Sequence, residues 1–133
     1  MYTVKKLDAI KTPLVNKFYA KYHVRGRANK QDEIWVVYNN IEIIAACRLQ
    51  EKNEFLFLST VFVAPAHRSK GLAKKLLLAL LHQQSRTVYS FAYKNIIDLY
   101  TDIGFNQVLT YTKALSSLYN LYKHRNLVVI KYP

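Results

Sequence analysis

Cysteine, acidic side chains and long apolar runs are all scarce in this 133-residue sequence. The single cysteine, Cys47, cannot form an internal disulfide and cannot build a zinc site without several histidines. On a strand, Cys47 is expected to be buried and unreactive. The longest aliphatic run, Leu76 to Leu81, is far shorter than the roughly 20 residues of a membrane-spanning helix. We therefore expect a soluble, cytoplasmic protein without a metal site and without a membrane partner.

The scarcity of acidic residues makes the chain strongly basic. It has 20 Lys and Arg against 8 Asp and Glu, which gives a net charge of +12. Hydrophobic residues make up 51% of the chain, which is too large a share for a disordered protein. Chains of about 100–200 residues commonly form one domain. We expect a single folded domain over residues 1–133.

The charge is unevenly distributed along the sequence. Residues 1–30 contain eight basic side chains and one acidic side chain, and no carboxylate occurs from residue 55 to residue 97. A positive field of this kind concentrates polyanions, such as phosphorylated cofactors or nucleic acid. The charge narrows the class of partner without choosing between these two.

The order of hydrophobic patterns predicts the fold class. Thr12 and Pro13 suit the N-cap and the first position of a helix. Phe55 to Val63 is so continuously apolar that we expect a strand buried on both faces. A strand–helix–strand crossover makes this strand and the one at 87–93 parallel neighbours. The predicted strands are 34–38, 41–49, 55–63, 87–93, 105–112 and 127–132, and the predicted helices are 12–22, 71–84, 95–103 and 115–122. The fold class is α/β, with a mixed central sheet of about six to seven strands flanked by helices.

Residues 61–73 carry the strongest chemical signal. They run from the end of an apolar strand, through a loop with Arg68 and Lys70, into the start of a Leu-rich helix. The first turn of a helix has unpaired backbone N–H groups and a partial positive charge, so it binds anions. Gly71 allows the backbone to approach a phosphate closely. The segment predicts a phosphate-binding site, in which His67 is expected to be a solvated loop residue.

This segment resembles the GNAT superfamily of N-acetyltransferases. The family motif Arg/Gln-x-x-Gly-x-Gly/Ala is matched by Arg68-x-x-Gly71-x-Ala73. The lead-in Val63-x-Pro65 from an apolar strand is also typical of the family, as is the Leu-rich helix that follows.

A second block strengthens the resemblance. After the predicted strand 87–93 come Asn95 and then Leu99-Tyr100-x-x-x-Gly104-Phe105, which resembles the family's second acyl-CoA segment. Together the two blocks cover about residues 33–105. The order of the predicted elements agrees with the family over nearly the whole chain.

The resemblance implies an acetyl-CoA cosubstrate and roles for the matching residues. The backbone of 61–63 would pair with the pantetheine arm, and one N–H there would polarise the thioester carbonyl. Backbone N–H groups of 68–73 would hold the pyrophosphate. Asn95 would hydrogen-bond the pantetheine or its pocket, although it could instead cap its helix, and Tyr100 would be the catalytic acid that protonates the departing CoA thiolate. The implied cofactor-binding residues are Val61, Phe62, Val63, Arg68, Ser69, Lys70, Gly71, Leu72, Ala73, Asn95 and Tyr100.

The resemblance also implies the reaction, in which an acceptor amine attacks acetyl-CoA directly in a ternary complex. Many family members carry a Glu on the third strand as general base, whereas residues 55–63 here contain no carboxylate. Glu54, Glu51 and Glu33 are other candidates for this role. We expect water, or an acceptor that arrives neutral, to take the place of a protein base.

Other functions stay open at the level of sequence. The chain could be a basic nucleic-acid-binding module, an acetyltransferase acting on an RNA-linked amine such as a charged tRNA, or a relative that keeps the fold without activity. The acceptor is a small-molecule or peptide amine that the sequence does not identify. A monomer and a homodimer are both compatible with the chain, with residues 111–122 as a candidate dimer contact. The sequence leaves the shape of 106–126 undetermined.

Overall fold

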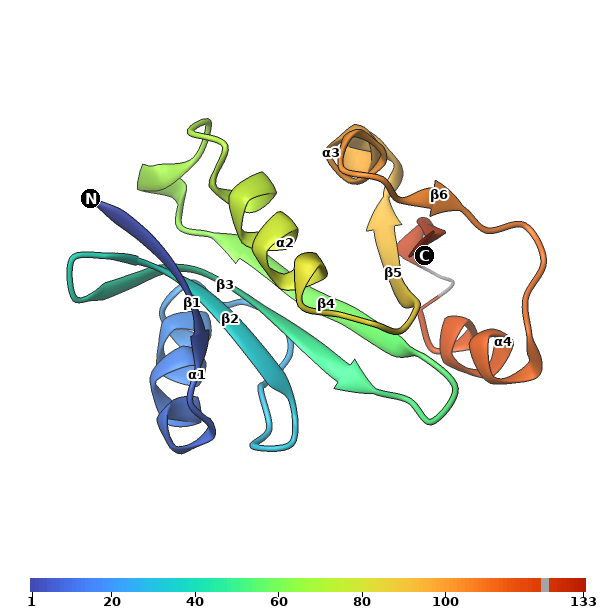
Figure 1. Cartoon of the computed structure of the whole chain (residues 1–133), viewed down its shortest axis with the longest axis horizontal. Helices are drawn as coiled ribbons and strands as arrows, with labels where there is room; N and C mark the ends of the chain where they lie inside the picture. Colours follow the sequence, from blue (N-terminus) through green and yellow to red (C-terminus); the bar gives the residue numbers. More distant parts are fainter. Residues whose placement is uncertain (123–124) are drawn as a thin grey trace. The chain divides into compact units, whose positions relative to one another are not determined.

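The computed structural model describes residues 1–122 and 125–133 (Figure 1). The strands in these residues are β1 (Tyr2–Leu7), β2 (Glu33–Asn39), β3 (Glu42–Glu51), β4 (Leu56–Val63), β5 (Val88–Tyr93), β6 (Asn106–Gln107) and β7 (Leu127–Tyr132). The α-helices are α1 (Thr12–Lys21), α2 (Leu72–His82), α3 (Ile97–Asp102) and α4 (Lys113–Asn120), and 3-10 turns cover Ala9–Lys11, Pro65–His67 and Lys94–Ile96. None of the helices within the described ranges is both long and apolar enough to cross a membrane.

The strands follow the sheet order β1-β2-β3-β4-β5-β7-β6. β1, β2 and β3 form an antiparallel meander, with Lys5 opposite Val36 and Trp35 opposite Cys47. β7 pairs in antiparallel orientation with both β5 and β6. The predicted α/β class is thereby confirmed, as is the mixed sheet of six to seven strands flanked by helices.

The chain forms two compact units, which we call the first unit and the second unit. The first unit contains Met1–Gln50 and Leu58–Gln84, and the second unit contains Glu51–Phe57 and Ser85–Pro133. Strand β4 therefore begins in the second unit and continues in the first. That residues 1–133 act as a single domain stays a prediction.

The first unit contains β1 to β3, most of β4, and the helices α1 and α2. Helix α1 starts at Thr12 and not at Pro13, because the Thr12 hydroxyl donates to the Ala9 carbonyl oxygen (2.6 Å) and Lys11 takes the N-cap position. Strand β1 is missing from the sequence prediction, since of its six residues only Leu7 is buried. Helix α2 lies against β1 and β2. Its buried residues are all leucines, namely Leu72, Leu76, Leu77, Leu80 and Leu81.

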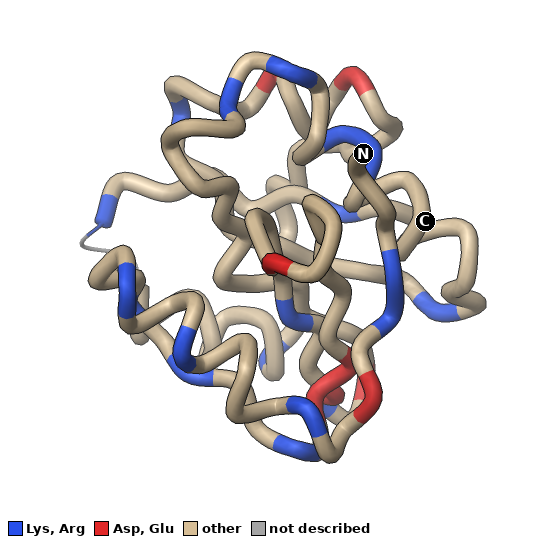
Figure 2. The backbone as a smooth tube through the Cα atoms, turned by 90° about the vertical axis from the view of Figure 1, so that its left-hand side faces the viewer, with Lys and Arg blue, Asp and Glu red and all other residues tan. Residues whose placement is uncertain are grey.

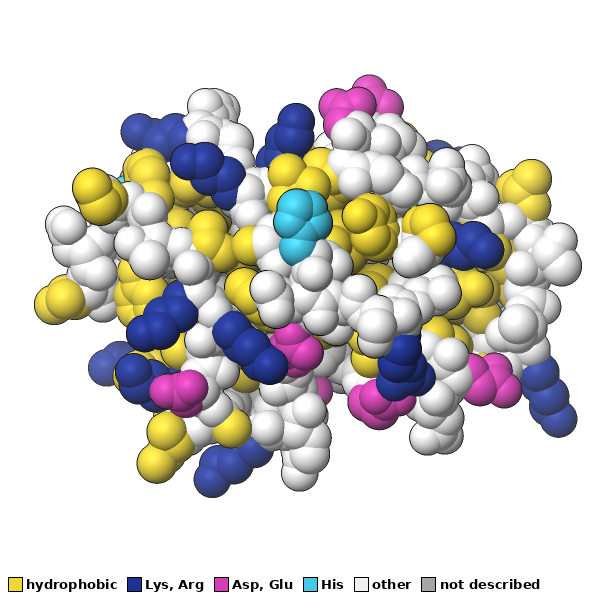
Figure 3. Space-filling model, in the orientation of Figure 1, with side chains coloured by type: hydrophobic (Ala, Val, Ile, Leu, Met, Phe, Trp, Pro, Cys, Tyr) yellow, Lys and Arg dark blue, Asp and Glu magenta, His cyan; other side chains and the backbone are white. Residues whose placement is uncertain are grey.

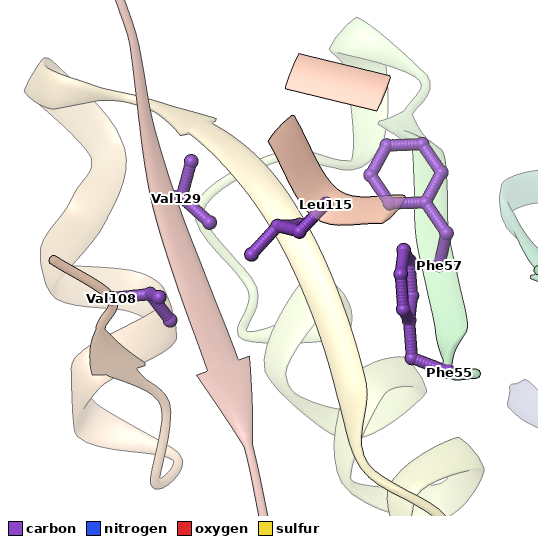
Figure 4. Packing of buried hydrophobic residues seen from close by; sticks show 5 residues of the cluster. All are labelled: Phe55, Phe57, Val108, Leu115 and Val129. Carbon is purple, nitrogen blue, oxygen red and sulfur yellow. The ribbon is translucent and has the colours of Figure 1, made fainter. Parts of the chain in front are cut away.

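The second unit has an apolar core of its own, shown in Figure 4. Its buried cluster consists of Phe55, Phe57, Val108, Leu115 and Val129. The partly buried residues packed against this cluster are Tyr89, Phe91, Ala114, Leu118 and Tyr119. Helix α4 supplies Leu115 to this core, so the short helix predicted in this part of the chain is confirmed.

The strand predicted over 105–112 is wrong in its extent, because β6 contains only Asn106–Gln107. The Phe105 N–H donates to the Tyr100 carbonyl oxygen (3.0 Å), so Phe105 belongs to the turn that ends α3. Beyond β6, Leu109 is 83% exposed. Up to residue 122, the segment 106–126 thus consists of β6, a loop and α4, and residues 123–124 lie outside the described part of the chain.

Candidate functional site

The second half of β4 is more exposed than its apolar sequence predicts. Leu58 is fully buried, whereas residues 59–63 are half-buried. Thr60 has a φ of +55°, a left-handed value that a β-branched residue rarely adopts. The predicted burial of this strand on both faces is therefore wrong beyond Leu58. Val61, Phe62 and Val63 remain partly open to solvent.

The loop after β4 brings an uncapped helix start to the surface. Ser69 and Gly71 have left-handed φ values of +64° and +73°. A Cβ built on Gly71 would have no heavy atom within 4 Å, so the backbone here borders open space. Helix α2 begins at the next residue, with no side-chain cap and no acidic residue in its first turn. Its first N–H groups are therefore available to an anion, as the predicted phosphate site requires, and anion binding itself stays a prediction.

Arg68 fastens this loop to the end of β4. Its Nε donates to the Val63 carbonyl oxygen (2.9 Å), and its guanidinium carbon lies 5.1 Å from the centre of the Phe62 ring. The side chain of Arg68 is thus a structural link as well as a positive charge beside the helix start. Lys70 is exposed in the same loop. The two predicted cations both lie beside the backbone that leads into α2.

His67 has a partner that sequence reasoning missed. The Tyr2 hydroxyl hydrogen-bonds to His67 Nδ1 (2.9 Å), and the two rings meet edge to face with centroids 5.7 Å apart. His67 is thus half-buried and hydrogen-bonded, and not simply solvated as the sequence led us to expect. The first residue of β1 holds the loop through this contact, and no sequence signal linked two residues so far apart along the chain.

The second unit positions the other predicted site residues on and before α3. Tyr100 lies on α3 and is 5% exposed, with its ring edge to face against Phe105 (centroids 5.5 Å apart). Asn95 is exposed in the 3-10 turn that precedes this helix. The N-cap position of α3 belongs to Ile96, without a side-chain cap, so the alternative of Asn95 as helix cap is wrong.

The three carboxylates considered as general base differ in their surroundings. Glu33 accepts hydrogen bonds from Trp35 Nε1 and Gln84 Nε2, both at 2.8 Å. Glu51 is bound by Arg86, and this hydrogen bond lowers the pKa of the Glu51 carboxyl. Glu54 is exposed at the hairpin before β4. Because Glu33 is engaged by two donors and Glu51 is held as a weaker base, neither is well set to remove a proton from an amine.

The structure also bears on two other kinds of chemistry, a reactive cysteine and a bound metal ion. Cys47 is fully buried on β3, and burial raises the pKa of its thiol far above the ordinary value, so it stays protonated. Its predicted burial is confirmed. Within residues 1–122 and 125–133, no group of three or more His, Cys, Asp and Glu is placed to hold a metal ion.

A family model identifies the class of the protein. The model, described as an acetyltransferase (GNAT) domain, matches residues 30–107, a range that contains both Arg68–Ala73 and Asn95–Phe105. The chain therefore belongs to the GNAT family and is an acetyltransferase by class. No curated protein matches its sequence.

Solved structures share the fold over nearly the whole chain. Escherichia coli ElaA matches with a TM-score of 0.71 and 15% identity, over 100% of both chains. N-acetylglutamate synthase from Neisseria gonorrhoeae, complexed with coenzyme A and N-acetyl-glutamate, has a TM-score of 0.74 and 9% identity, over 99% of this chain and 35% of that one. Diaminobutyrate acetyltransferase EctA from Paenibacillus lautus, in complex with L-2,4-diaminobutyric acid and coenzyme A, has a TM-score of 0.69 and 13% identity, over 98% of this chain and 93% of that one. At these identities the likeness establishes the fold.

Proposed function

We propose that this protein is an acetyl-CoA-dependent N-acetyltransferase, in which an acceptor amine attacks the thioester directly in a ternary complex. The observation that carries the proposal is the uncapped start of α2 behind two left-handed residues, Ser69 and Gly71, the second of which borders open space. Family membership supports the choice of anion, since two of the similar structures were solved with coenzyme A. A cytoplasmic location stays a prediction of the sequence.

The first unit would bind the donor. Backbone N–H groups from Arg68 to Ala73 would hold the pyrophosphate, because the helix start supplies both unpaired donors and a partial positive charge. The partly open backbone of Val61, Phe62 and Val63 would pair with the pantetheine arm. One N–H in this stretch would polarise the thioester carbonyl. The proposed donor contacts within this range include Ser69, Lys70, Gly71 and Leu72.

Tyr100 would be the acid, as its position in the family motif implies. A thiol of pKa about 8.5 leaves as a thiolate, and a phenol of pKa about 10 beside it can donate or share a proton. This role follows from the position of Tyr100 in the family motif. Asn95, in the turn before α3, would hydrogen-bond the pantetheine or its pocket.

The acceptor would be a small-molecule or peptide amine that loses its proton to water. The names of the similar enzymes favour amines of amino acids as the first compounds to test. Since Glu33 and Glu51 are both held by other side chains, the scheme assigns the proton to water and not to either of them. Monomer and homodimer are both compatible with it.

Release of CoA thiol from acetyl-CoA, followed with a panel of amines, tests the proposal. The matched variants are Tyr100→Phe and Tyr111→Phe, since Tyr111 is 37% exposed in the loop before α4. We expect Tyr100→Phe to lower kcat about 100-fold, the contribution of a positioned acid, with a much smaller change in the Kd for acetyl-CoA. Tyr111→Phe should behave like the wild type. Full kcat in Tyr100→Phe would remove Tyr100 from the mechanism.

A second candidate function, RNA binding, is favoured by an exposed basic surface of the first unit. It consists of six cations directly before, on and after α1, each without an ion pair to any described residue: Lys11, Lys17, Lys21, Arg25, Arg27 and Lys30. Figure 2 marks the basic and acidic positions along the backbone, and Figure 3 shows Lys and Arg side chains projecting where Figure 1 places α1 and β1. Lys21 also lies 5.4 Å from the centre of the Tyr22 ring, which adds an aromatic surface for bases. The acceptor amine could then be one carried by RNA, such as a charged tRNA.

Salt-dependent binding of a single-stranded RNA oligonucleotide tests this second candidate. The test variant is Lys17→Glu/Lys21→Glu, and its control is Lys113→Glu/Lys131→Glu, which makes the same change in net charge on exposed positions of the second unit. We expect the first variant to reduce the slope of log K against log salt by about 0.7 for each lost phosphate contact. Equal losses in both variants would mean that net charge alone binds RNA, and no binding by the wild type would remove the candidate.

A further inference from the structure

Thr60 holds a strained position in the middle of β4. Its φ of +55° lies in the left-handed region, where the branched Cβ of threonine is sterically unfavourable. A residue in such a conformation persists only when its surroundings hold it there. The residues directly after Thr60 are Val61, Phe62 and Val63, the proposed partners of the pantetheine arm. A change in φ at Thr60 would redirect all three.

A buried polar network surrounds this residue. The Tyr19 hydroxyl donates to the Thr60 carbonyl oxygen (2.8 Å), and Arg48 Nη1 lies 3.5 Å from Thr60 Oγ1. Tyr19 is 1% exposed, and burial raises the pKa of its hydroxyl, which therefore stays protonated and able to donate. Asp32 fixes Arg48 in turn, because its Oδ2 accepts a hydrogen bond from Nε (2.9 Å) and forms an ion pair with Nη2 (2.9 Å).

The loop before β2 completes this network. Asp32 Oδ2 also accepts the Asn29 N–H (2.9 Å), so the carboxylate is held from two sides. A Cβ built on Gly26 would lie 3.2 Å from Thr60 Oγ1 and 3.5 Å from Arg48 Nη1, and φ at Gly26 is +103°. The glycine therefore allows the loop to close directly over the Thr60 side chain. Helix α1, strand β3 and this loop all contribute groups that meet at one strained residue.

We propose that Tyr19 and Arg48 are positioning residues, which hold Thr60 in its left-handed conformation and thereby set the backbone of Val61–Val63 for the donor. This inference rests on the proposed function. The alternative is that the same contacts only add stability to the first unit. The two explanations predict different results. A positioning role predicts weaker binding of the donor and faster hydrogen exchange at the Val61–Val63 amides, both beyond what a general loss of stability would cause.

The variant Tyr19→Phe tests the proposal against Thr12→Val. Both positions are buried on α1, and each substitution removes one hydroxyl that donates to a backbone carbonyl oxygen. We expect similar falls in Tm for the two variants. Only Tyr19→Phe should raise the Kd for CoA, by about fivefold, which corresponds to about 1 kcal/mol. It should also speed hydrogen exchange at the amides of Val61–Val63, which Thr12→Val should leave unchanged.

A rescue variant separates positioning from stability. Glycine adopts positive φ without strain, so Tyr19→Phe/Thr60→Gly should bind CoA within about twofold of Thr60→Gly. Unchanged affinity and exchange in Tyr19→Phe would overturn the inference, as would equal effects in Thr12→Val. A wild type that binds no CoA would instead overturn the proposed function, and the exchange measurement would still decide whether Tyr19 holds the strand.

Discussion

The two units use a left-handed glycine in opposite ways. In the first unit, Gly71 has a φ of +73°, and a Cβ there would meet no atom within 4 Å. In the second unit, Gly104 has a φ of +115°, and a Cβ there would lie 2.9 Å from Tyr132 Cε1. One glycine therefore leaves backbone open to a ligand, whereas the other allows an aromatic ring to pack against the chain.

The same contrast extends to the neighbours of each glycine. Behind Gly71, Arg68 lies over the half-buried Phe62 ring and links the loop to β4. Beside Gly104, Phe105 packs against both Tyr100 and Tyr132, with ring centroids 5.5 and 5.6 Å apart. The first arrangement fixes a loop while leaving its amides accessible. The second closes a core.

The largest effect on stability is expected in the core of the second unit. Leu115 is 1% exposed, and Leu115→Ala would leave a cavity that costs roughly 2–5 kcal/mol of the free energy of unfolding. Leu121 is 66% exposed, so Leu121→Ala should change it by less than about 0.5 kcal/mol. Denaturation in urea measures both. Equal losses would contradict the core drawn in Figure 4.

Gly104→Ala is expected to have the next largest effect on the free energy of unfolding. Its Cβ would meet the Tyr132 ring, and its backbone would remain left-handed, so we expect a loss of about 2–4 kcal/mol in the free energy of unfolding. The same urea titration measures it. A loss below that of Gly71→Ala would show that Tyr132 yields to the new methyl group and would remove the contrast between the two glycines.

Gly71→Ala measures the energetic cost of the left-handed backbone conformation alone. Because the added methyl group meets open space, only the left-handed φ is costly, and we expect a loss of about 1 kcal/mol. The comparison with Gly104→Ala under identical conditions is the measurement. A loss as large as that of Gly104→Ala would mean that the loop is packed and not open.

The smallest effect concerns the ion pair between the exposed Glu51 and the half-buried Arg86 in the second unit. Arg86 lowers the pKa of the Glu51 carboxyl in the folded protein. The stabilisation is therefore present above the unfolded pKa and is lost as pH falls through the folded one. Tm measured against pH should show Glu51→Gln slightly less stable than wild type near pH 7 and equal to it in acid. Glu54→Gln, at an exposed position without an ion pair to a described residue, should show no such difference.

The elements predicted correctly from the sequence are those that have a local pattern of residues. The continuous apolar run of β4 and the leucines of α2 each lie within a few residues, and both elements were predicted correctly in place. β1 was missed, because its partner β2 lies some thirty residues away and its own side chains are mostly exposed. The hydrogen bond from Tyr2 to His67 was missed for the same reason.

The strain at Thr60 could not be predicted either. It depends on Tyr19, Arg48 and the loop at Gly26, which come together only in the folded chain. The length of β6 was overestimated because Phe105 and Leu109 look like strand residues locally, whereas the turn after α3 takes the first and solvent surrounds the second. Local patterns thus predicted the candidate donor loop, and long-range contacts determined how it is held.

Calorimetric titration of acetyl-CoA into the wild type and Gly71→Glu tests the central claim most directly. The substitution puts a carboxylate into the open space where the pyrophosphate is proposed to lie, and circular dichroism checks that the variant is folded. We predict that the wild type binds acetyl-CoA and free CoA, whereas folded Gly71→Glu binds neither. Equal affinity of the two proteins would contradict the donor site at α2, and no binding by a folded wild type would contradict the proposed enzyme.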